Sequence, residues 1–293
     1  MGNSVDKLLF QPPRPASYTN SPNFFPLSTG KNLTIQAFFV RHERAKFTIL
    51  FSHGNAEDIG MIYDWFKEVA IQLECNVMGY DYLGYGLSDG EKPSETDCFY
   101  SAQAAFDFLT ETQGYMPDEI VLYGRSLGSG ASCELGSKLS REGRPPAGVI
   151  LQSPLMSAYR VAFHFRYSMP GDMMCNIDKI PSIDAPVFIL HGRRDEIVPF
   201  WHGECLYLAT KPKFRYPPLW VEDAGHNNIE VIVQRKKSGL FFQRLKEFFH
   251  YLQKNERGIA DEDMEYKHDP SCCSSRRTEA PKGEGKAIKT VLE

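Results

Sequence analysis

The feature that most constrains the fold of this chain lies at residues 119–130, where an apolar run meets Gly-Arg-Ser-Leu-Gly and then a series of small residues. A G-x-S-x-G pattern between a strand and a helix is the nucleophile elbow, a sharp turn that raises a serine hydroxyl above a sheet. Glycine flanks the serine on both sides because larger side chains would clash in so tight a turn. The pattern predicts the chemistry of a serine hydrolase, with Ser126 as the nucleophile.

A second segment, residues 86–90, also matches the pattern, with Ser88 at its centre. No apolar strand leads into this segment, and Pro93 behind it disfavours a helix at the residue before. We therefore interpret residues 84–93 as a loop and Ser88 as a turn residue.

Three regions differ in composition along the chain. Residues 1–33 are rich in proline, asparagine and serine, and we expect an irregular arm there. Residues 34–253 alternate between strand-like and helix-like blocks, which predicts an α/β domain whose mostly parallel sheet is covered by helices on both faces. Together with the elbow, this pattern predicts the alpha/beta-hydrolase fold. Residues 254–293 are too polar to bury a core, so we expect a disordered C-terminal tail.

Within the domain, the hydrophobic periodicity predicts the individual elements. The expected strands are 34–40, 47–52, 76–80, 119–123, 148–152, 186–191 and 218–222, and the expected helices are 61–74, 96–112, 127–140, 202–209 and 228–252. Residues 154–185 have no clear period, and we expect this short segment to cap the site. Its large apolar side chains could line a groove for an acyl chain or could equally be core packing; they are Met156, Phe163, Phe165, Met169, Met173 and Met174.

The composition is that of an ordinary globular protein and excludes several classes. The chain has 293 residues, of which 42% are hydrophobic, and a net charge of −4, so a nucleic-acid partner is not expected. No run approaches the roughly 18 apolar residues of a membrane span, and the first residues lack the apolar stretch of a secretory signal. The seven cysteines form no C-x-x-C motif, so we expect no metal site, and the five scattered ones are expected to be free thiols in a reducing compartment. We also expect no cofactor.

A serine hydroxyl needs a base, and in this fold the acid and the histidine follow the serine in that order along the chain. Asp195 follows the strand-like run 186–190 and is the best candidate for the acid. Glu196 is an alternative, whereas Asp184 precedes the run and would lie at the wrong end of the strand. The loop after the last expected strand supplies His226, which we predict to be the base.

The oxyanion of an acyl-transfer intermediate needs two backbone N–H donors. The amide of Leu127, just after the nucleophile, is predicted to be one. Gly54 lets the backbone turn after an early strand, so the Asn55 amide is predicted to be the other, with Ala56 as second choice. For the neighbouring His53 we expect a structural role in holding this loop.

Six motifs stand in order along the chain and together resemble the alpha/beta-hydrolase domain-containing protein 17 family. They are residues 52–56 (SHGNA), 81–86 (DYLGYG), 124–128 (GRSLG), 152–155 (QSPL), 176–180 (NIDKI) and 224–227 (AGHN). The likeness covers about residues 18–253. It implies a serine hydrolase that removes palmitate from cysteine thioesters of membrane-associated proteins, and it implies Ser126, Asp195 and His226 as the triad.

The resemblance also implies attachment to membranes, but this chain departs from the family in how it could be attached. Family members typically carry a palmitoylated N-terminal cysteine cluster, whereas the first cysteine here is Cys75. Gly2 could be myristoylated, although the motif is only partly matched, and the tail offers Cys272 and Cys273 for palmitoylation. We expect a peripheral protein at the cytoplasmic face of the plasma membrane or endosomes, with a cytosolic location as the alternative.

The resemblance leaves other functions open. A lysophospholipase or a monoacylglycerol-type esterase would use the same triad, and a scaffold could keep the fold without catalysis. The complete triad argues against a scaffold. A peptidase of related fold is disfavoured because neither a helical cap nor an amine-binding acidic pair is evident. The expected partners are S-palmitoylated proteins and the lipid surface, and the chain is expected to be a monomer.

Overall fold

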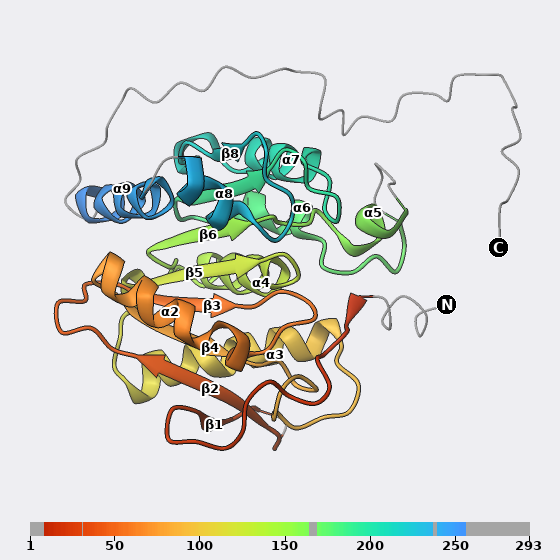
Figure 1. The fold of residues 1–293 in the computed structure, drawn as a ribbon, viewed down its shortest axis with the longest axis vertical. Coiled ribbons are helices and arrows are strands. Elements are labelled where there is room, and N and C mark those ends of the chain that lie inside the picture. The colour runs from red at the N-terminus through yellow and green to blue at the C-terminus, as the bar shows by residue number, and fades with distance from the viewer. Residues whose placement is uncertain (1–8, 31, 164–168, 237–238, 256–293) are drawn as a thin grey trace, which may run out of the picture.

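The computed structural model describes residues 9–30, 32–163, 169–236 and 239–255. An eight-stranded sheet crosses the molecule in the order β1-β2-β4-β3-β5-β6-β7-β8 (Figure 1). Pairing is antiparallel between β1, β2 and β4 and parallel through the rest of the sheet. The strands are β1 (Phe25–Ser28), β2 (Thr34–Val40), β3 (Thr48–Ser52), β4 (Asn76–Tyr80), β5 (Ile120–Arg125), β6 (Gly148–Gln152), β7 (Val187–Gly192) and β8 (Leu219–Val221). The predicted alpha/beta-hydrolase fold is confirmed.

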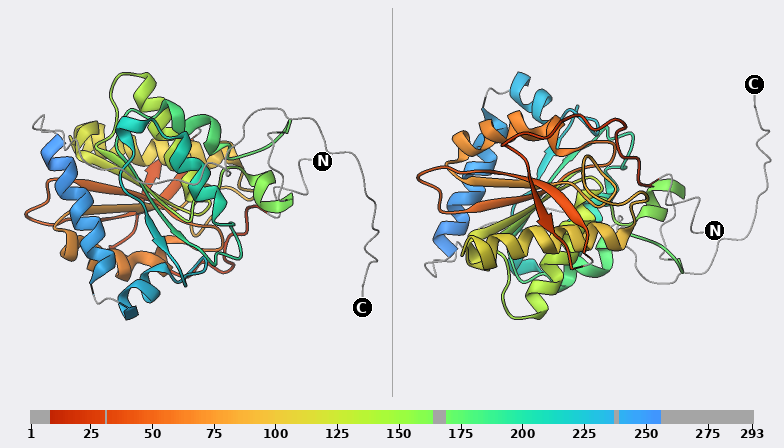
Figure 2. Two further views of the ribbon diagram at one scale, coloured as in Figure 1. Left: turned by 90° about the horizontal axis from the view of Figure 1, so that it is seen from above. Right: turned by 90° about the horizontal axis from the view of Figure 1, so that it is seen from below.

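Helices cover both faces of the sheet, as the two end-on views show (Figure 2). One face carries α2 (Ile59–Leu73), α8 (Ile229–Lys236) and α9 (Leu240–Asn255). The other face carries α3 (Glu95–Asp107), α4 (Gly128–Arg141) and α7 (Trp201–Ala209). The segment between β6 and β7 holds two short helices, α5 (Ala158–Phe163) and α6 (Asn176–Lys179).

The central strands divide the core into two layers because successive side chains of a strand point to opposite faces. In β3, Leu50 packs into the layer under α3 and α4, while Ile49 and Phe51 pack into the layer under α2 and α9. In β5, Leu122 joins the first layer and Tyr123 the second. Both faces of these strands are buried, so their sequences are continuously apolar rather than alternating.

The N-terminal arm is less irregular than expected. Residues 25–28 form β1, which pairs with β2, and both Phe10 and Tyr18 are buried in the core layers. The strand was missed because it is short and contains Pro26, which lacks an N–H and is tolerated only at the edge of a sheet.

The C-terminal end of the domain also differs from the expectation. The expected helix 228–252 is two helices, α8 and α9, and Gly239 before α9 has a φ of 84°, a left-handed conformation that interrupts a helix. α9 continues to Asn255, so the start of the predicted tail at 254 was wrong by two residues. The rest of the predicted tail lies outside the described residues.

Candidate active site

The predicted elbow directly follows β5, at the carboxyl end of the sheet. Ser126 has a φ of 51°, and its amide donates to the Gln152 carbonyl at 2.9 Å. A side chain at Gly128 would place its Cβ 2.0 Å from the Ser52 carbonyl oxygen, and one at Gly124 would lie 2.5 Å from the Gly128 carbonyl. Backbone atoms therefore exclude any larger residue on either side of the serine, which is why this turn requires both glycines.

The three predicted triad residues lie in contact although they come from distant parts of the chain. Ser126 Oγ lies 2.8 Å from His226 Nε2, and His226 Nδ1 lies 2.8 Å from Asp195 Oδ2. The residues follow β5, β8 and β7, whose carboxyl ends meet at one edge of the sheet. Both the histidine and the acid are buried, so this chain of hydrogen bonds is shielded from water. It can pass the serine proton to an imidazole that a carboxylate orients.

The carboxylate of Asp195 is held in its ionised form. Oδ1 accepts the amides of Ile197 at 3.0 Å and Val198 at 2.7 Å, and Oδ2 lies 3.2 Å from His191 Nε2. Burial opposes ionisation of this side chain, but hydrogen bonds from His191 and His226 outweigh it and hold the pKa of Asp195 well below its usual range.

The alternative acids lie elsewhere. Glu196 is exposed and its carboxylate lies beside Gly225, and Asp184 precedes β7 and pairs with Lys211 at 2.6 Å. Asp195 therefore remains the only one of the three that contacts His226.

Two candidate oxyanion donors face the same space as the serine. Asn55 and Leu127 both line the groove that contains Ser126, and no described residue accepts a hydrogen bond from either backbone amide. Ala56, the second choice, adopts a left-handed φ of 56°, a conformation that costs a non-glycine residue energy and is found at functional sites. Leu127 begins the turn into α4, so its amide sits at a helix N-terminus, which favours negative charge.

His53 and Ser88, the other histidine and serine that the motifs draw attention to, make contacts outside the triad. His53 is fully buried, with Nδ1 2.7 Å from the Gly54 carbonyl and Nε2 3.3 Å from Asp81 Oδ1. Ser88 accepts the Gln36 amide at 2.9 Å and lies in a loop, as predicted. Both side chains therefore hold loops together and neither contacts the serine at the elbow.

A groove of about 330 Å³ opens at the serine. Apart from Ser126 and Asn55, the described residues that line it are apolar: Leu9, Leu127, Leu155, Ala158, Val161, Ala162, Ile197 and Val198. The methionines and phenylalanine proposed for this lining do not contribute to it. Met156 and Met174 are buried in the core, Met173 is half-buried, and Phe163 and Met169 are about half exposed. Phe165 lies outside the described residues. Sequence periodicity could not find the lining because it comes from five separate segments of the chain.

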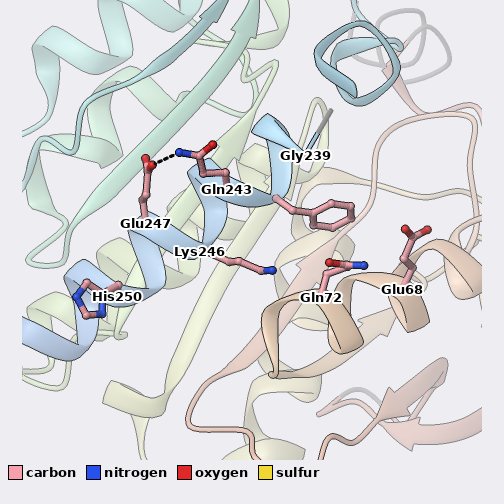
Figure 3. Close-up of a pocket in the computed structure, with 8 residues that line it drawn as sticks. Glu68, Gln72, Gly239, Gln243, Lys246, Glu247 and His250 are labelled. Atoms are coloured by element: carbon pink, nitrogen blue, oxygen red, sulfur yellow. Dashed lines mark hydrogen bonds between the residues drawn. The ribbon is translucent and has the colours of Figure 1, made fainter. Parts of the chain in front are cut away.

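A larger hollow of about 560 Å³ lies between α2 and α9 and is shown in Figure 3. Glu68 and Gln72 of α2 face Lys246 of α9 across it (Figure 3). Because α2 runs back along the sheet from the oxyanion loop, its last turns lie near the amino ends of the strands. This hollow is therefore remote from Ser126 and has none of the triad's chemistry.

Sequence reasoning missed two supports of the site. His191 lies near the end of β7 and contacts Asp195, which follows four residues later. Its position in the strand that leads to the acid was the sequence signal that could have identified it. Arg125 forms an ion pair with Glu57 of the oxyanion loop and lies 3.8 Å from Glu230 of α8. Arg125 thus links the elbow to the oxyanion loop and to α8. Only its position inside the G-x-S-x-G motif could have drawn attention to it.

The described part of the chain contains no cluster of three or more histidine, cysteine or acidic side chains that could bind a metal ion. Nor does any helix in those ranges combine the length and the apolar character needed to cross a bilayer. Gly2, Cys272 and Cys273, the candidate lipidation sites, lie outside the described residues.

A mostly parallel sheet with a serine, a histidine and an acid at the carboxyl ends of its strands defines an alpha/beta hydrolase. A family profile described as Hydrolase_4, serine aminopeptidase S33, matches residues 43–170. An esterase of Pyrococcus furiosus superposes with a TM-score of 0.63 over 83% of this chain and 98% of its own, at 17% identity, and shows the same fold.

Two curated proteins are much more similar in sequence. Alpha/beta hydrolase domain-containing protein 17B of Homo sapiens is 39% identical over 226 residues, which are 76% of this chain and 74% of that protein. Protein 17C of Xenopus tropicalis is 39% identical over 225 residues, covering 76% and 68%. The chain belongs to the alpha/beta hydrolase domain-containing protein 17 family, as its motifs predicted.

Proposed function

We propose that this hydrolase cleaves palmitoyl thioesters of S-acylated proteins through an acyl-serine intermediate. The single observation that carries the proposal is the apolar groove that opens on Ser126 beside the backbone amides of Leu127 and Asn55, from which no described residue accepts a hydrogen bond. An acyl chain fits this lining, and a carbonyl oxygen at its end would meet the amides of Leu127 and Asn55. No residue of the described lining is acidic, so the groove offers nothing to bind the amino terminus of a peptide.

In the proposed first half-reaction, His226 takes the proton of Ser126 as Oγ attacks the thioester carbonyl carbon. The carbonyl oxygen becomes an oxyanion held by the two amides, while Asp195 stabilises the imidazolium. The C–S bond then breaks, and His226 returns its proton to the departing cysteine sulfur. In the second half-reaction, water attacks the acyl-serine ester with the same base and releases the fatty acid and the free serine.

A lipid surface is the proposed partner beside the groove. Ile197 lines the groove and Phe163 directly follows the groove-lining Ala162, yet these two large apolar side chains are 52% and 50% exposed. Exposed apolar residues around a binding groove are typical of a contact with a membrane or another protein. We propose that the protein acts at the cytoplasmic face of membranes, with Gly2 and the pair Cys272 and Cys273 as candidate lipid anchors. The alternative is a cytosolic enzyme.

The nucleophile is tested with a fluorophosphonate probe on the full chain. We expect wild-type protein to be labelled and Ser126→Ala not to be. Ser88→Ala is the matched control, because Ser88 sits in the second G-x-S-x-G pattern but contacts the Gln36 amide instead of a histidine. Labelling that persists in Ser126→Ala and disappears in Ser88→Ala would overturn the assignment.

The substrate is tested with a panel on purified protein: an S-palmitoyl peptide, the matching O-palmitoyl serine peptide, a lysophospholipid and a monoacylglycerol. We expect palmitate release from the thioester at the highest kcat/KM, abolished in Ser126→Ala. Hydrolysis of the lysophospholipid or monoacylglycerol without the thioester would instead assign a lipid esterase. Intact mass measurement of protein isolated from cells would show whether Gly2, Cys272 or Cys273 carries an acyl group.

A further inference from the structure

The side chain of Asn55 is fixed by two donors from outside its own loop. Its Oδ1 accepts the backbone amide of Gln11 at 2.8 Å and the hydroxyl of Tyr85 at 2.8 Å. The Tyr85 side chain is fully buried, so its hydroxyl is positioned by core packing. A carboxamide oxygen has two lone pairs, and both are used here. The residue whose amide we propose as an oxyanion donor is therefore clamped through its side chain.

The first of these donors belongs to a segment, residues 9–18, that is docked along the whole oxyanion loop. Phe10 is buried in the core, and the Ser17 amide donates to Asp58 Oδ2 at 2.7 Å. Asp58 is the N-cap of α2, the helix that the oxyanion loop leads into. A Cβ at Gly60 in the first turn of α2 would lie 2.5 Å from Ser17 Oγ, so the contact depends on a glycine.

Tyr18 ties the same segment to the loop that carries Tyr85. Its hydroxyl donates to Asp81 Oδ2 at 2.5 Å and accepts the Leu87 amide at 3.1 Å. Asp81 also accepts the Ile59 amide at the start of α2, at 2.9 Å. Tyr18 and Asp81 thus join the N-terminal segment, the loop that carries Tyr85 and the start of α2 to one another.

From these contacts we propose that residues 9–18 and Tyr85 are positioning elements of the oxyanion site, and that they set where the Asn55 amide points. The proposal rests on the function proposed above. Such a clamp is needed because the loop contains Ala56 in a left-handed conformation, which persists only when its surroundings hold it. The docked segment also places Leu9 in the groove wall, so the N-terminal part of the chain contributes directly to the site.

The clamp is tested by removing each donor in the full chain. Tyr85→Phe deletes one hydroxyl, and Gln11→Pro deletes one amide hydrogen. Gln11→Ala keeps the amide and separates the loss of the glutamine side chain from the loss of the donor. Tyr115→Phe is the matched tyrosine control, since its hydroxyl accepts Asn76 Nδ2 at 3.0 Å at the amino end of β4, away from the site. Thermal unfolding of each variant shows whether it is folded.

Turnover is measured on a nitrophenyl ester, together with inhibition by a trifluoromethyl ketone, which forms a tetrahedral adduct with a catalytic serine. In Tyr85→Phe and Gln11→Pro we expect kcat to fall about 5- to 30-fold with little change in KM, less than the roughly 100- to 1,000-fold cost of losing a whole donor. The inhibition constant of the ketone should rise by the same factor, because the ketone's oxyanion uses the same amides. Gln11→Ala should lose much less than Gln11→Pro.

The outcomes separate the two proposals. Folded Tyr85→Phe and Gln11→Pro proteins with wild-type kcat and ketone affinity overturn the clamp and leave the proposed function intact. Equal losses in Gln11→Ala and Gln11→Pro also overturn the role of the amide. A wild-type protein that neither hydrolyses esters nor reacts with the fluorophosphonate probe overturns both proposals.

Discussion

Replacing Ser126 by alanine and by glycine separates the strain of the elbow from its chemistry. Both variants lack the hydroxyl, but only alanine keeps a Cβ in the left-handed backbone, where φ is 51°. That conformation costs a residue with a side chain roughly 1–2 kcal/mol. Glycine in turn loses roughly 0.4–1 kcal/mol through the greater entropy of its unfolded chain. The central values of these two ranges predict that Ser126→Gly is more stable than Ser126→Ala by about 0.8 kcal/mol.

The second G-x-S-x-G pattern supplies a control in the same molecule. Ser88 is not among the described residues with positive φ, and its hydrogen bond with Gln36 is lost equally in both replacements. Only the unfolded-state contribution then remains, so Ser88→Gly should be less stable than Ser88→Ala by about 0.4–1 kcal/mol. The order of alanine and glycine is thus expected to reverse between two serines in the same local sequence pattern.

The assay is urea-induced unfolding followed by circular dichroism, with thermal unfolding as a second measurement. For a domain of this size, 1 kcal/mol corresponds to about 2–4 °C in Tm, so the Ser126 pair should differ by about 1–4 °C. If Ser126→Ala equals or exceeds Ser126→Gly in stability while the Ser88 pair behaves as expected, the backbone at Ser126 is not strained and the reasoning fails.

Three further changes test other parts of the site. Gly128→Ala would put a Cβ 2.0 Å from the Ser52 carbonyl oxygen. Because the two backbone segments would have to move apart, we expect urea unfolding to show a loss of about 1–3 kcal/mol in stability. We also expect labelling by the fluorophosphonate probe to be lost. Asp195→Asn should lower kcat by about 10,000-fold. The pKa of Asp195 is lower in the folded protein than in the unfolded chain, where it is about 3.9. The ionised carboxylate therefore stabilises the fold above about pH 3.9, and this contribution is lost as the pH falls through the folded pKa. The difference in unfolding free energy between wild type and Asp195→Asn should shrink from pH 7 to pH 3 in urea unfolding. Ala162→Trp should fill part of the apolar groove, so that KM rises for a palmitoyl substrate and stays unchanged for an acetyl ester; equal effects on both would contradict the placement of the acyl chain.

The fold and the three triad positions could be predicted because their signals are local. Each strand of the parallel region is a continuous apolar run, and the elbow carries its own glycines. Asp195 and His226 were predicted from their order in the chain and from their positions just after strands. Because the carboxyl ends of parallel strands meet at one edge of the sheet, these positions bring the two side chains close together. The short edge strand β1 gave no such signal, because four residues with a proline do not show a period.

The groove and the supports of the site could not be predicted because they depend on contacts between distant segments. Leu9 and Ile197 meet in one lining although 188 residues apart, a fact that no local pattern contains. The methionines of 154–185 were attractive as an acyl groove, yet Met174 is fully buried against α4, whose Gly130 makes room for it. A flexible apolar side chain fills a gap in a core as readily as it lines a binding site, so composition cannot decide between them.

Three of the six described non-glycine residues with a left-handed backbone lie at the edge of the sheet that carries the chemistry. Ala56, Ser126 and Ser153 are non-glycine residues in the left-handed region, and they follow β3, β5 and β6. Ser126 and Ser153 each donate their amide to the carbonyl of a neighbouring strand end, at 2.9 and 2.8 Å, so the sheet itself holds them in place. No described residue accepts the Ala56 amide, and Ala56 follows Asn55, whose side chain accepts from Gln11 and Tyr85. The strained turn at Ala56 is therefore held by residues 9–18 and Tyr85 rather than by the sheet. This explains why the N-terminal segment, which contains no catalytic motif, packs against the oxyanion loop.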